Sequence, residues 1–481
     1  MPRASQPAVT CNRGRAAVSA TLVVLLAIGL TAIGTGCRKP RVAVPVRNLV
    51  VICIDTLRAD HVGAWGYERA TTPAIDALAR RGVRFANAFS TSSWTVPSVA
   101  SILTSLPPAL HGAGVFGQVR QLSETQPPHQ VSAEIPMLAQ HVSALGYRTA
   151  LFSANPFLYG RFKDGFETAV VDRVDATRLT DSALEWLAAP DARPRFLYLQ
   201  YMDLHQPNRP PDPYFQYFPA PDGQPHELRH GDWSYGQVLD LEDPEFQRFR
   251  DHRIALYDGA LRYTDAQIAR LLERLDEPPY AGQTLVVLTA DHGEEFWDHA
   301  LEEARHRDDP RGFWGVGHGH TLYQEQLHVP LIASGGNFTG GAVDPCLTSL
   351  LDIAPTLLSA AGLAPLPRMH GRPLAQPGER AADAGCPNRA LGASSTAYGP
   401  ETNALRIDNW KLIEASGRKP ELFHLAEDPQ ERHDRSVESP QTLAAMARRL
   451  KQIRALEPAA PGAEPPANPG LVEELRALGY I

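Results

Sequence analysis

The chain has 481 residues, of which 43% are hydrophobic and 21% are charged, so it is long enough to bury a large core. This length predicts one large domain with a smaller companion. The net charge is −8, from 54 acidic against 46 basic side chains, and no sustained run of Lys or Arg occurs in the body of the chain. Nucleic acid is therefore excluded as an expected partner.

Residues 1–36 have the pattern of an export signal. Arginines precede an uncharged run from Ala16 to Gly36, and small residues lead directly to Cys37. The segment 34–37 resembles the processing site of bacterial lipoproteins, which predicts a signal peptide and a lipidated Cys37. An uncleaved membrane anchor is the alternative, because the uncharged run is long enough to span a bilayer. Both alternatives predict an exported, membrane-anchored protein, periplasmic or at the cell surface, with a tether at 37–46.

The next part of the chain, 47–372, alternates strands with helices. Apolar runs predict buried strands, and helical periodicity with capping residues predicts helices. The predicted strands are 47–54, 147–152, 196–202, 284–290 and 329–333, and the predicted helices are 72–81, 97–105, 135–145, 180–187, 254–275 and 347–361. This alternation favours an α/β fold, with a large, mainly parallel sheet covered by helices on both faces. Residues 206–250 and 296–317 are expected to be excursions from the sheet.

The pattern changes in the last part of the chain. Residues 404–413 and 421–425 predict strands of a hairpin or a small antiparallel sheet, and an amphipathic helix is predicted at 442–456. We therefore expect a small C-terminal α+β subdomain over 373–457. A Pro- and Ala-rich linker with a short helical tail is expected over 458–481.

The cysteine positions agree with export. Cys53 stands in an apolar strand and is expected to be a buried thiol. Cys346 and Cys386 are candidates for a disulfide in an oxidising compartment, although sequence gives no distance between them.

Acidic and imidazole side chains stand at the ends of two predicted strands. Asp55 follows the first strand, and Asp291 and His292 follow the strand at 284–290. Because the carboxyl ends of strands line the ligand crevice of an open α/β sheet, these residues predict a metal site. The alternative for each is a turn former or a helix cap.

Thr95 stands just ahead of a predicted helix whose first turn contains Pro97. Free backbone N–H groups and the positive end of the helix dipole favour an anion at this point. A hydroxyl here is placed to attack a bound phosphoryl or sulfuryl group. Taken alone, Thr95 would be a helix cap, and Asp55 and Asp291 favour the catalytic interpretation.

Several segments together resemble successive motifs of the sulfatase family, within the alkaline phosphatase superfamily. They are 55–61, 95–98, 289–295, 317–323 with 329–331, 351–356, 410–412, 428–431 and 475–480. The resemblance covers roughly residues 47–481, and its motifs occur in the family's order and spacing. It implies a metal-dependent ester hydrolase.

The resemblance also implies a ligand set. Asp55, Asp291 and His292 match metal ligands of the family, and Thr95 matches both the nucleophile and a fourth ligand. One divalent ion is expected. Mn²⁺ or Zn²⁺ is favoured and Ca²⁺ is the alternative, because imidazole suits the first two better. A second metal ion is a further alternative.

Two substrate-contacting positions of the family are matched by histidines. His205 resembles the histidine that contacts the substrate or its leaving group. His318 or His320 lies where the family places a basic residue on the substrate anion, and the motif does not decide between them. Arg58 and His61 belong to the first motif and are expected to have structural roles.

The chain departs from the family's pattern at three positions. Thr56 stands where a second aspartate is usual, which removes a charged ligand. Thr95 replaces the Cys or Ser that sulfatases oxidise to formylglycine, and Val99 replaces an arginine of the modification motif. No formylglycine is expected, because threonine cannot form that aldehyde. Threonine nucleophiles resemble those of nucleotide pyrophosphatases and lipoteichoic acid synthases in the same superfamily.

The expected function is therefore hydrolysis of an ester of a small molecule, glycan or lipid. Phosphate mono- or diesters are favoured, and a sulfuric ester hydrolase of the arylsulfatase kind is the first alternative. A membrane-tethered transferase of phospho groups is the second. A non-catalytic binding protein is the third, and it is disfavoured because Asp55, Asp291 and His292 are all present.

Overall fold

The computed structural model describes residues 45–114, 128–231, 240–312, 314–375, 385–386 and 388–455, with the single residues 470 and 473. The expected signal or anchor at 1–36, most of the tether and nearly all of the tail at 458–481 lie outside these residues. Within the described part of the chain, no helix has the length and apolarity needed to cross a membrane.

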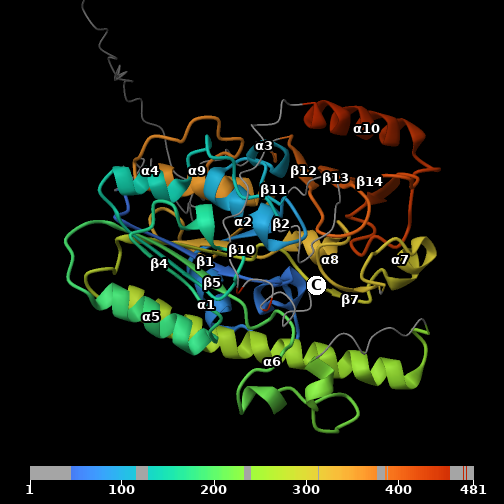
Figure 1. Ribbon diagram of the computed structural model, residues 1–481, viewed down its shortest axis with the longest axis horizontal. Coiled ribbons are helices and arrows are strands. Elements are labelled where there is room, and N and C mark those ends of the chain that lie inside the picture. The colour runs from blue at the N-terminus through green and yellow to red at the C-terminus, as the bar shows by residue number, and fades with distance from the viewer. Residues whose placement is uncertain are drawn as a thin grey trace, which may run out of the picture. The chain divides into compact units, whose positions relative to one another are not determined.

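A nine-stranded sheet forms the centre of the structure (Figure 1). Its strand order is β11-β2-β10-β6-β1-β5-β3-β4, with β9 paired to β2. The strands are β1 (Asn48–Ile54), β2 (Val83–Phe89), β3 (Arg148–Ser153), β4 (Thr168–Val171), β5 (Arg195–Tyr201), β6 (Thr284–Thr289), β9 (His328–Val329), β10 (Leu331–Ser334) and β11 (Ala342–Ser349). Only β9 and β10 pair antiparallel with their neighbours, so the predicted large, mainly parallel sheet is confirmed.

Helices cover both faces of this sheet. In Figure 1, α5 and α6 lie on one side with α1, and α2, α4 and α9 lie on the other. The helices are α1 (Pro73–Arg81), α2 (Thr95–Thr104), α3 (Pro108–His111), α4 (Leu138–Ala144), α5 (Ala176–Ala188), α6 (Pro244–Leu275), α7 (Ala300–His306), α8 (Gln324–Leu327), α9 (Ile353–Ala360) and α10 (Pro440–Arg454). The central strand β1 is buried along its whole length, which is why its sequence is an unbroken apolar run.

Local sequence explains where two of the helices begin. Thr72 precedes α1, and Pro73 occupies its first position. The long helix α6 starts at Pro244, ten residues before the predicted start at 254, because the Asp243 side chain accepts a hydrogen bond from the Glu245 N–H and caps it. The excursion predicted at 206–250 therefore ends at Asp243.

Two segments differ from the predicted elements. The predicted helix at 347–361 is wrong in its first part, because residues up to Ser349 form the end of β11, parallel to β2. The Ser349 side chain accepts the Leu351 N–H, and the helix α9 itself starts at Ile353. The predicted strand at 329–333 is broken at Pro330 into β9 and β10, because proline has no N–H for a ladder hydrogen bond.

A smaller α+β unit follows, as predicted. Its antiparallel sheet has the order β12 (Ala390–Ser394), β13 (Thr402–Ile407), β14 (Trp410–Ala415) and β15 (Glu421–His424), and α10 packs on it. The predicted strand 404–413 is a hairpin in the structure. Ile407 pairs with Trp410, and Asp408 between them has a φ of 51°. Cys346 and Cys386 form a disulfide, and Cys53 is a buried free thiol as predicted.

Candidate active site

The predicted ligands Asp55, Asp291 and His292 meet where neighbouring strands end. Asp55 follows β1 and the other two follow β6, which pairs in parallel with β1. All three are fully buried, and one ligand atom of each lies within 4.8 Å of those of the others. His292 Nε2 is 3.6 Å from Asp55 Oδ1 and 3.6 Å from Asp291 Oδ2.

Hydrogen bonding prepares this group for a cation. His292 Nδ1 donates to the Gly293 carbonyl at 2.9 Å, so the lone pair of Nε2 points at the two carboxylates. Asp55 Oδ1 is buried and has no hydrogen-bond partner among the described residues. Burial and the Asp55 charge raise the pKa of Asp291 to about 7. A divalent cation would satisfy the orphaned oxygen and offset the repulsion, so these residues fit one.

Thr95 is the first residue of α2 and is fully buried. Its hydroxyl donates to Asp55 Oδ2 at 3.3 Å and lies 3.4 Å from His292 Nε2. The helix begins two residues earlier than predicted, so the capping position belongs to Trp94 and not to Thr95. The alternative that Thr95 merely caps the helix is therefore wrong, since its hydroxyl contacts the carboxylate–histidine group.

Serine hydroxyls hold the start of α2 against the end of β6. Ser90 Oγ donates to the Asp291 carbonyl at 2.5 Å, and Ser98 Oγ donates to the Ser92 carbonyl at 3.0 Å. These bonds tie the turn before α2 to Asp291 and to the first turn of the helix. These hydrogen bonds to the backbone, in addition to the side-chain rotamer of Thr95, fix the position of its hydroxyl.

Two further residues touch this group and are missing from the sequence prediction. Asn155, just past β3, donates from Nδ2 to Asp55 Oδ2 at 2.6 Å and to Thr95 Oγ1 at 3.1 Å. Gln200, in β5, donates to Asp291 Oδ2 at 3.0 Å. Both are polar residues at the carboxyl ends of parallel strands that otherwise read as apolar. That position is the signal that identifies them.

His318 and His205 lie beside the metal-ligand group. The His318 ring centroid is 4.5 Å from that of His292, and the His205 ring is 4.9 Å from that of His318. Burial, together with the neighbouring His318, lowers the pKa of His205 to about 4. Burial, together with His292, lowers the pKa of His318.

His320 lies in a different cluster, although the motif left it as an alternative to His318. Its Nε2 is 3.1 Å from Glu295 Oε2 and 3.3 Å from Glu303 Oε2. Burial alone would lower the pKa of His320, but the Glu303 charge, together with the hydrogen bonds to Glu295 and Glu303, outweighs burial and raises the pKa to about 10. The structure thus places His318, and not His320, next to His292. His320 forms a buried ion-pair group with the two glutamates.

The other residues of the first motif have structural contacts. Thr56 is buried with a φ of 58°, and its hydroxyl donates to the Asp55 carbonyl at 2.7 Å. Arg58 pairs with Asp298 at 2.7 Å, and His61 Nδ1 lies 2.8 Å from a buried aspartate, Asp258. Thr56 therefore does not take the place of a second carboxylate ligand in this arrangement.

A cavity of about 230 Å³ adjoins this region. Ala154, next to Asn155, and His205 both line it, together with Arg173, Asp203 and Arg209. Cationic and anionic groups therefore share its wall.

Comparisons with known proteins agree with this geometry. A model of the sulfatase family, described as "Sulfatase", matches residues 47–363. A sulfatase from Formosa agariphila is 22% identical over 441 residues, which cover 80% of this chain and 82% of that protein. Mouse arylsulfatase K is 29% identical over 212 residues, which are 41% of this chain and only 35% of that protein.

Among solved structures, a phosphonate monoester hydrolase from Silicibacter pomeroyi has the same fold. Its TM-score is 0.65 at 21% identity, and the match covers 86% of this chain and 96% of that one. The family model spans well over half of the present chain and includes Asp55, Thr95, Asp291 and His292. The chain therefore belongs to the sulfatase family, the ester hydrolases of the alkaline phosphatase superfamily.

Proposed function

We propose that this protein hydrolyses phosphate mono- or diesters and uses Thr95 as its nucleophile. The observation that carries the proposal is the position of the Thr95 hydroxyl. It is fully buried at the start of α2, 3.3 Å from Asp55 Oδ2 and 3.4 Å from His292 Nε2. A hydroxyl between metal ligands, at the positive end of a helix, has the surroundings that activate a nucleophile toward an anionic ester.

Asp55, Asp291 and His292 would hold one divalent ion, with Mn²⁺ or Zn²⁺ favoured because of the imidazole ligand. Such an ion, when bound, lowers the pKa of a neighbouring hydroxyl and offsets charge that develops on the ester oxygens. In the absence of formylglycine, Thr95 is the remaining candidate for the fourth ligand.

The chain's own residues divide the remaining work. Asp55 Oδ2 accepts the hydrogen of Thr95 Oγ, and Asn155 holds both groups in place through its amide. Free N–H groups of the first turn of α2 bind the anionic oxygens of the ester. Thr95 Oγ attacks the phosphorus in line while the bond between phosphorus and the leaving oxygen breaks. The hydroxyl proton of Thr95 ends on the leaving oxygen, which His205 and His318 contact. The group beyond the ester occupies the cavity beside His205.

Phosphate is favoured over sulfate because of how the covalent intermediate must be released. A formylglycine hydrate expels sulfate with its second hydroxyl, and a threonine ester has none. Water must therefore attack the intermediate at phosphorus or sulfur. Attack by an alcohol in place of water would transfer the phospho group to that alcohol. A substrate panel with and without added alcohol therefore also tests for a phospho-group transferase.

Sulfuric ester hydrolysis is the second candidate, because the Formosa agariphila relative is called a sulfatase and the mouse relative an arylsulfatase. The phosphonate monoester hydrolase from Silicibacter pomeroyi adds phosphonate monoesters to the substrates worth testing.

We also propose that the protein is exported and held at a membrane, through a lipid on Cys37 or an uncleaved anchor. The basic and apolar pattern of residues 1–36 supports this proposal. The Cys346–Cys386 disulfide also supports it, since disulfides persist in oxidising compartments.

A substrate panel tests the proposal. Aryl sulfate, phosphate monoester, phosphodiester and phosphonate monoester are compared with Mn²⁺ or Zn²⁺, with and without added alcohol. We expect phosphate esters to be the best substrates, and radiolabel from a quenched phosphate ester to map to the peptide that contains Thr95. Efficient aryl sulfate hydrolysis without phosphate activity would overturn the substrate assignment.

A further inference from the structure

Three buried histidines meet in a part of the structure that shares no residue with the Thr95 site. His226 and His230 come from the excursion after β5, and His252 comes from α6. One ring nitrogen of each lies within 4.8 Å of those of the others. The rings of His230 and His252 stack at 4.1 Å, and the His226 ring stands edge-on to His252 at 4.9 Å.

The hydrogen bonds of the Nε2 atoms of His226 and His252 determine which ring nitrogen carries the hydrogen. His226 Nε2 lies 2.8 Å from the Phe218 carbonyl, and His252 Nε2 lies 3.3 Å from Asp222 Oδ2. Carbonyl and carboxylate oxygens only accept hydrogen bonds, so both Nε2 atoms carry the hydrogen. Neutral rings then present two bare Nδ1 atoms to each other, and these are only 2.8 Å apart. Two lone pairs at this separation repel unless a positive charge lies between them.

We propose that His226, His230 and His252 bind a transition-metal cation of the Zn²⁺ class. Imidazole nitrogen suits Zn²⁺, Ni²⁺, Cu²⁺ and Co²⁺, and it disfavours Mg²⁺ and Ca²⁺. Ligating histidines in proteins donate their other ring N–H to a carboxylate or a backbone carbonyl. His252 does this to Asp222, and His226 does it to the Phe218 carbonyl.

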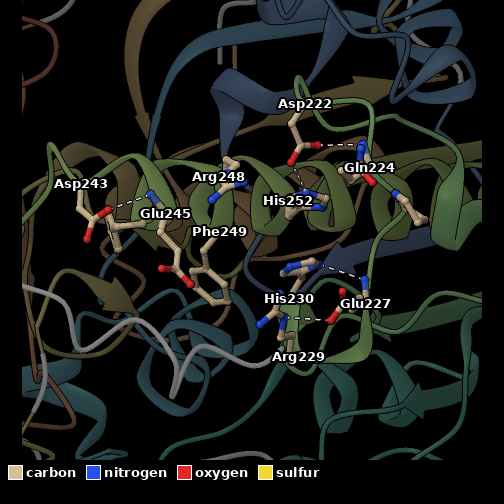
Figure 2. Close-up of a pocket in the computed structure, with 12 residues that line it drawn as sticks. Asp222, Gln224, Glu227, Arg229, His230, Asp243, Glu245, Arg248, Phe249 and His252 are labelled. Atoms are coloured by element: carbon tan, nitrogen blue, oxygen red, sulfur yellow. Dashed lines mark hydrogen bonds and ion pairs between the residues drawn. The ribbon is translucent and has the colours of Figure 1, made fainter.

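His230 is the weakest of the three ligands. Its Nδ1 accepts the Glu227 N–H at 2.9 Å, and a neutral imidazole has a single lone pair. Ligation takes that lone pair, so His230 gives up this hydrogen bond when it binds the ion. Figure 2 shows His230 with its hydrogen-bond partner Glu227 and His252 with its partner Asp222.

A cavity gives the ion a way in. Its volume is about 510 Å³, and both His230 and His252 line it (Figure 2). Four carboxylates line the same cavity, from Asp222, Glu227, Asp243 and Glu245, against the two guanidinium groups of Arg229 and Arg248. The excess of negative charge favours a cation there. The remaining space suits a water molecule as a fourth ligand, which completes a tetrahedral set around Zn²⁺.

The ion would fasten the excursion to α6 and, through it, the segment that contains His205. Gly231, next to His230, accepts a hydrogen bond from Arg253 at 2.5 Å and another from the Asn208 N–H at 3.3 Å. Asn208 Nδ2 in turn donates to the Leu204 carbonyl at 2.6 Å. The site is therefore structural, and its loss is expected to loosen the chain between β5 and α6.

Metal content of the full chain tests the proposal. The protein is stripped with a chelator, reloaded with Zn²⁺ and analysed by mass spectrometry, and Co²⁺ replaces Zn²⁺ for an absorption spectrum. We expect His226→Gln and His252→Gln to bind one equivalent less than the wild type and to lose the Co²⁺ bands of that site. His230→Gln should weaken binding by a smaller factor. His328→Gln, which changes a histidine outside the cluster, should bind as the wild type does.

A second variant keeps the test independent of folding. Asp222→Asn leaves all three imidazoles in place and removes only the carboxylate behind His252, so we expect about 10- to 100-fold weaker Zn²⁺ binding. Asp291→Asn should lose the ion of the Thr95 site and retain this one, so failure of either assignment is distinguishable. Unchanged Zn²⁺ content and affinity in His226→Gln and Asp222→Asn would overturn the proposal and leave a proton shared between the two Nδ1 atoms.

Discussion

The Thr95 site and the three-histidine site each bring together three candidate metal ligands from two segments of the chain, but with different chemistry. The first has two carboxylates and one imidazole at the ends of β1 and β6, with a hydroxyl 3.3 Å from Asp55. The second has three imidazoles where an excursion meets α6, and its carboxylate, Asp222, lies behind a histidine. The ends of β1 and β6 deliver two carboxylates beside the Thr95 hydroxyl, whereas the excursion and α6 deliver three imidazoles. Under the two proposals, an ion of the same chemical class would serve catalysis at the first site and would anchor the excursion at the second.

The largest expected effect is on turnover at the Thr95 site, and it should leave the three-histidine site unaffected. Thr95→Ala should reduce kcat by about three orders of magnitude or more, since it removes the attacking oxygen. Zn²⁺ bound by the three histidines should be unchanged. Thr95→Ser retains a hydroxyl and is the matched control, with partial activity. Steady-state kinetics and metal content on the same preparations make the measurement. Near-normal turnover of the alanine variant would remove Thr95 from the mechanism.

The next effect concerns the ligands at the strand ends. Asp291→Asn keeps the shape of the side chain and removes its charge. The Thr95 site should therefore lose its metal ion, and the activity should fall by about 100-fold or more. Far-ultraviolet circular dichroism should be unchanged. Metal analysis checks the result, and a variant that retains every equivalent of bound metal would contradict the ligand assignment.

A smaller effect is expected from the amide that supports the Thr95 site. Asn155→Ala removes the donor to Asp55 Oδ2 and Thr95 Oγ1, which should lower kcat/KM by about 10- to 100-fold. Asn155→Asp has the same size but adds a negative charge, so it should be the more damaging change. If both variants keep the kcat/KM of the wild type, the Asn155 amide does not position Asp55 and Thr95.

Sequence reasoning found the strand-end site because its physical cause is local. Asp55 and Asp291 directly follow apolar runs, and Thr95 directly precedes a helical pattern, so each stands next to a recognisable element. Gln200 escaped because a single glutamine in the otherwise apolar run FLYLQY does not change the pattern of a buried strand. Asn155 escaped because it lies two residues past the end of β3, where a polar residue is ordinary.

The three-histidine site was not predicted because nothing local connects its members. His226 and His230 lie in an excursion without periodicity, and His252 lies in the part of α6 before its predicted start. Only the folded structure places the histidines of the excursion next to His252 of α6. His320 gives the converse case, since its motif position is two residues from His318 but its ring points to Glu295 and Glu303. Neighbouring residues of a loop face different clusters, and sequence spacing does not specify which.

The smallest effect concerns Asp203, at the start of the excursion that joins the two sites. Burial, with the nearby Asp175 charge, raises its pKa to about 7, against 3.8 in the unfolded chain, and its Oδ1 accepts the Ala176 N–H. Because the folded-state pKa is raised, its contribution to stability is full below pH 3.8, declines as the pH rises and is lost above pH 7. Asp203→Asn resembles the protonated form, so it should be more stable than the wild type at pH 8, by about 2 kcal/mol at most for a partly exposed group, and equal to it near pH 4. Melting temperatures of both proteins across this range, with Zn²⁺ present throughout, make the measurement. A difference that stays constant across this pH range would mean that Asp203 does not titrate on unfolding.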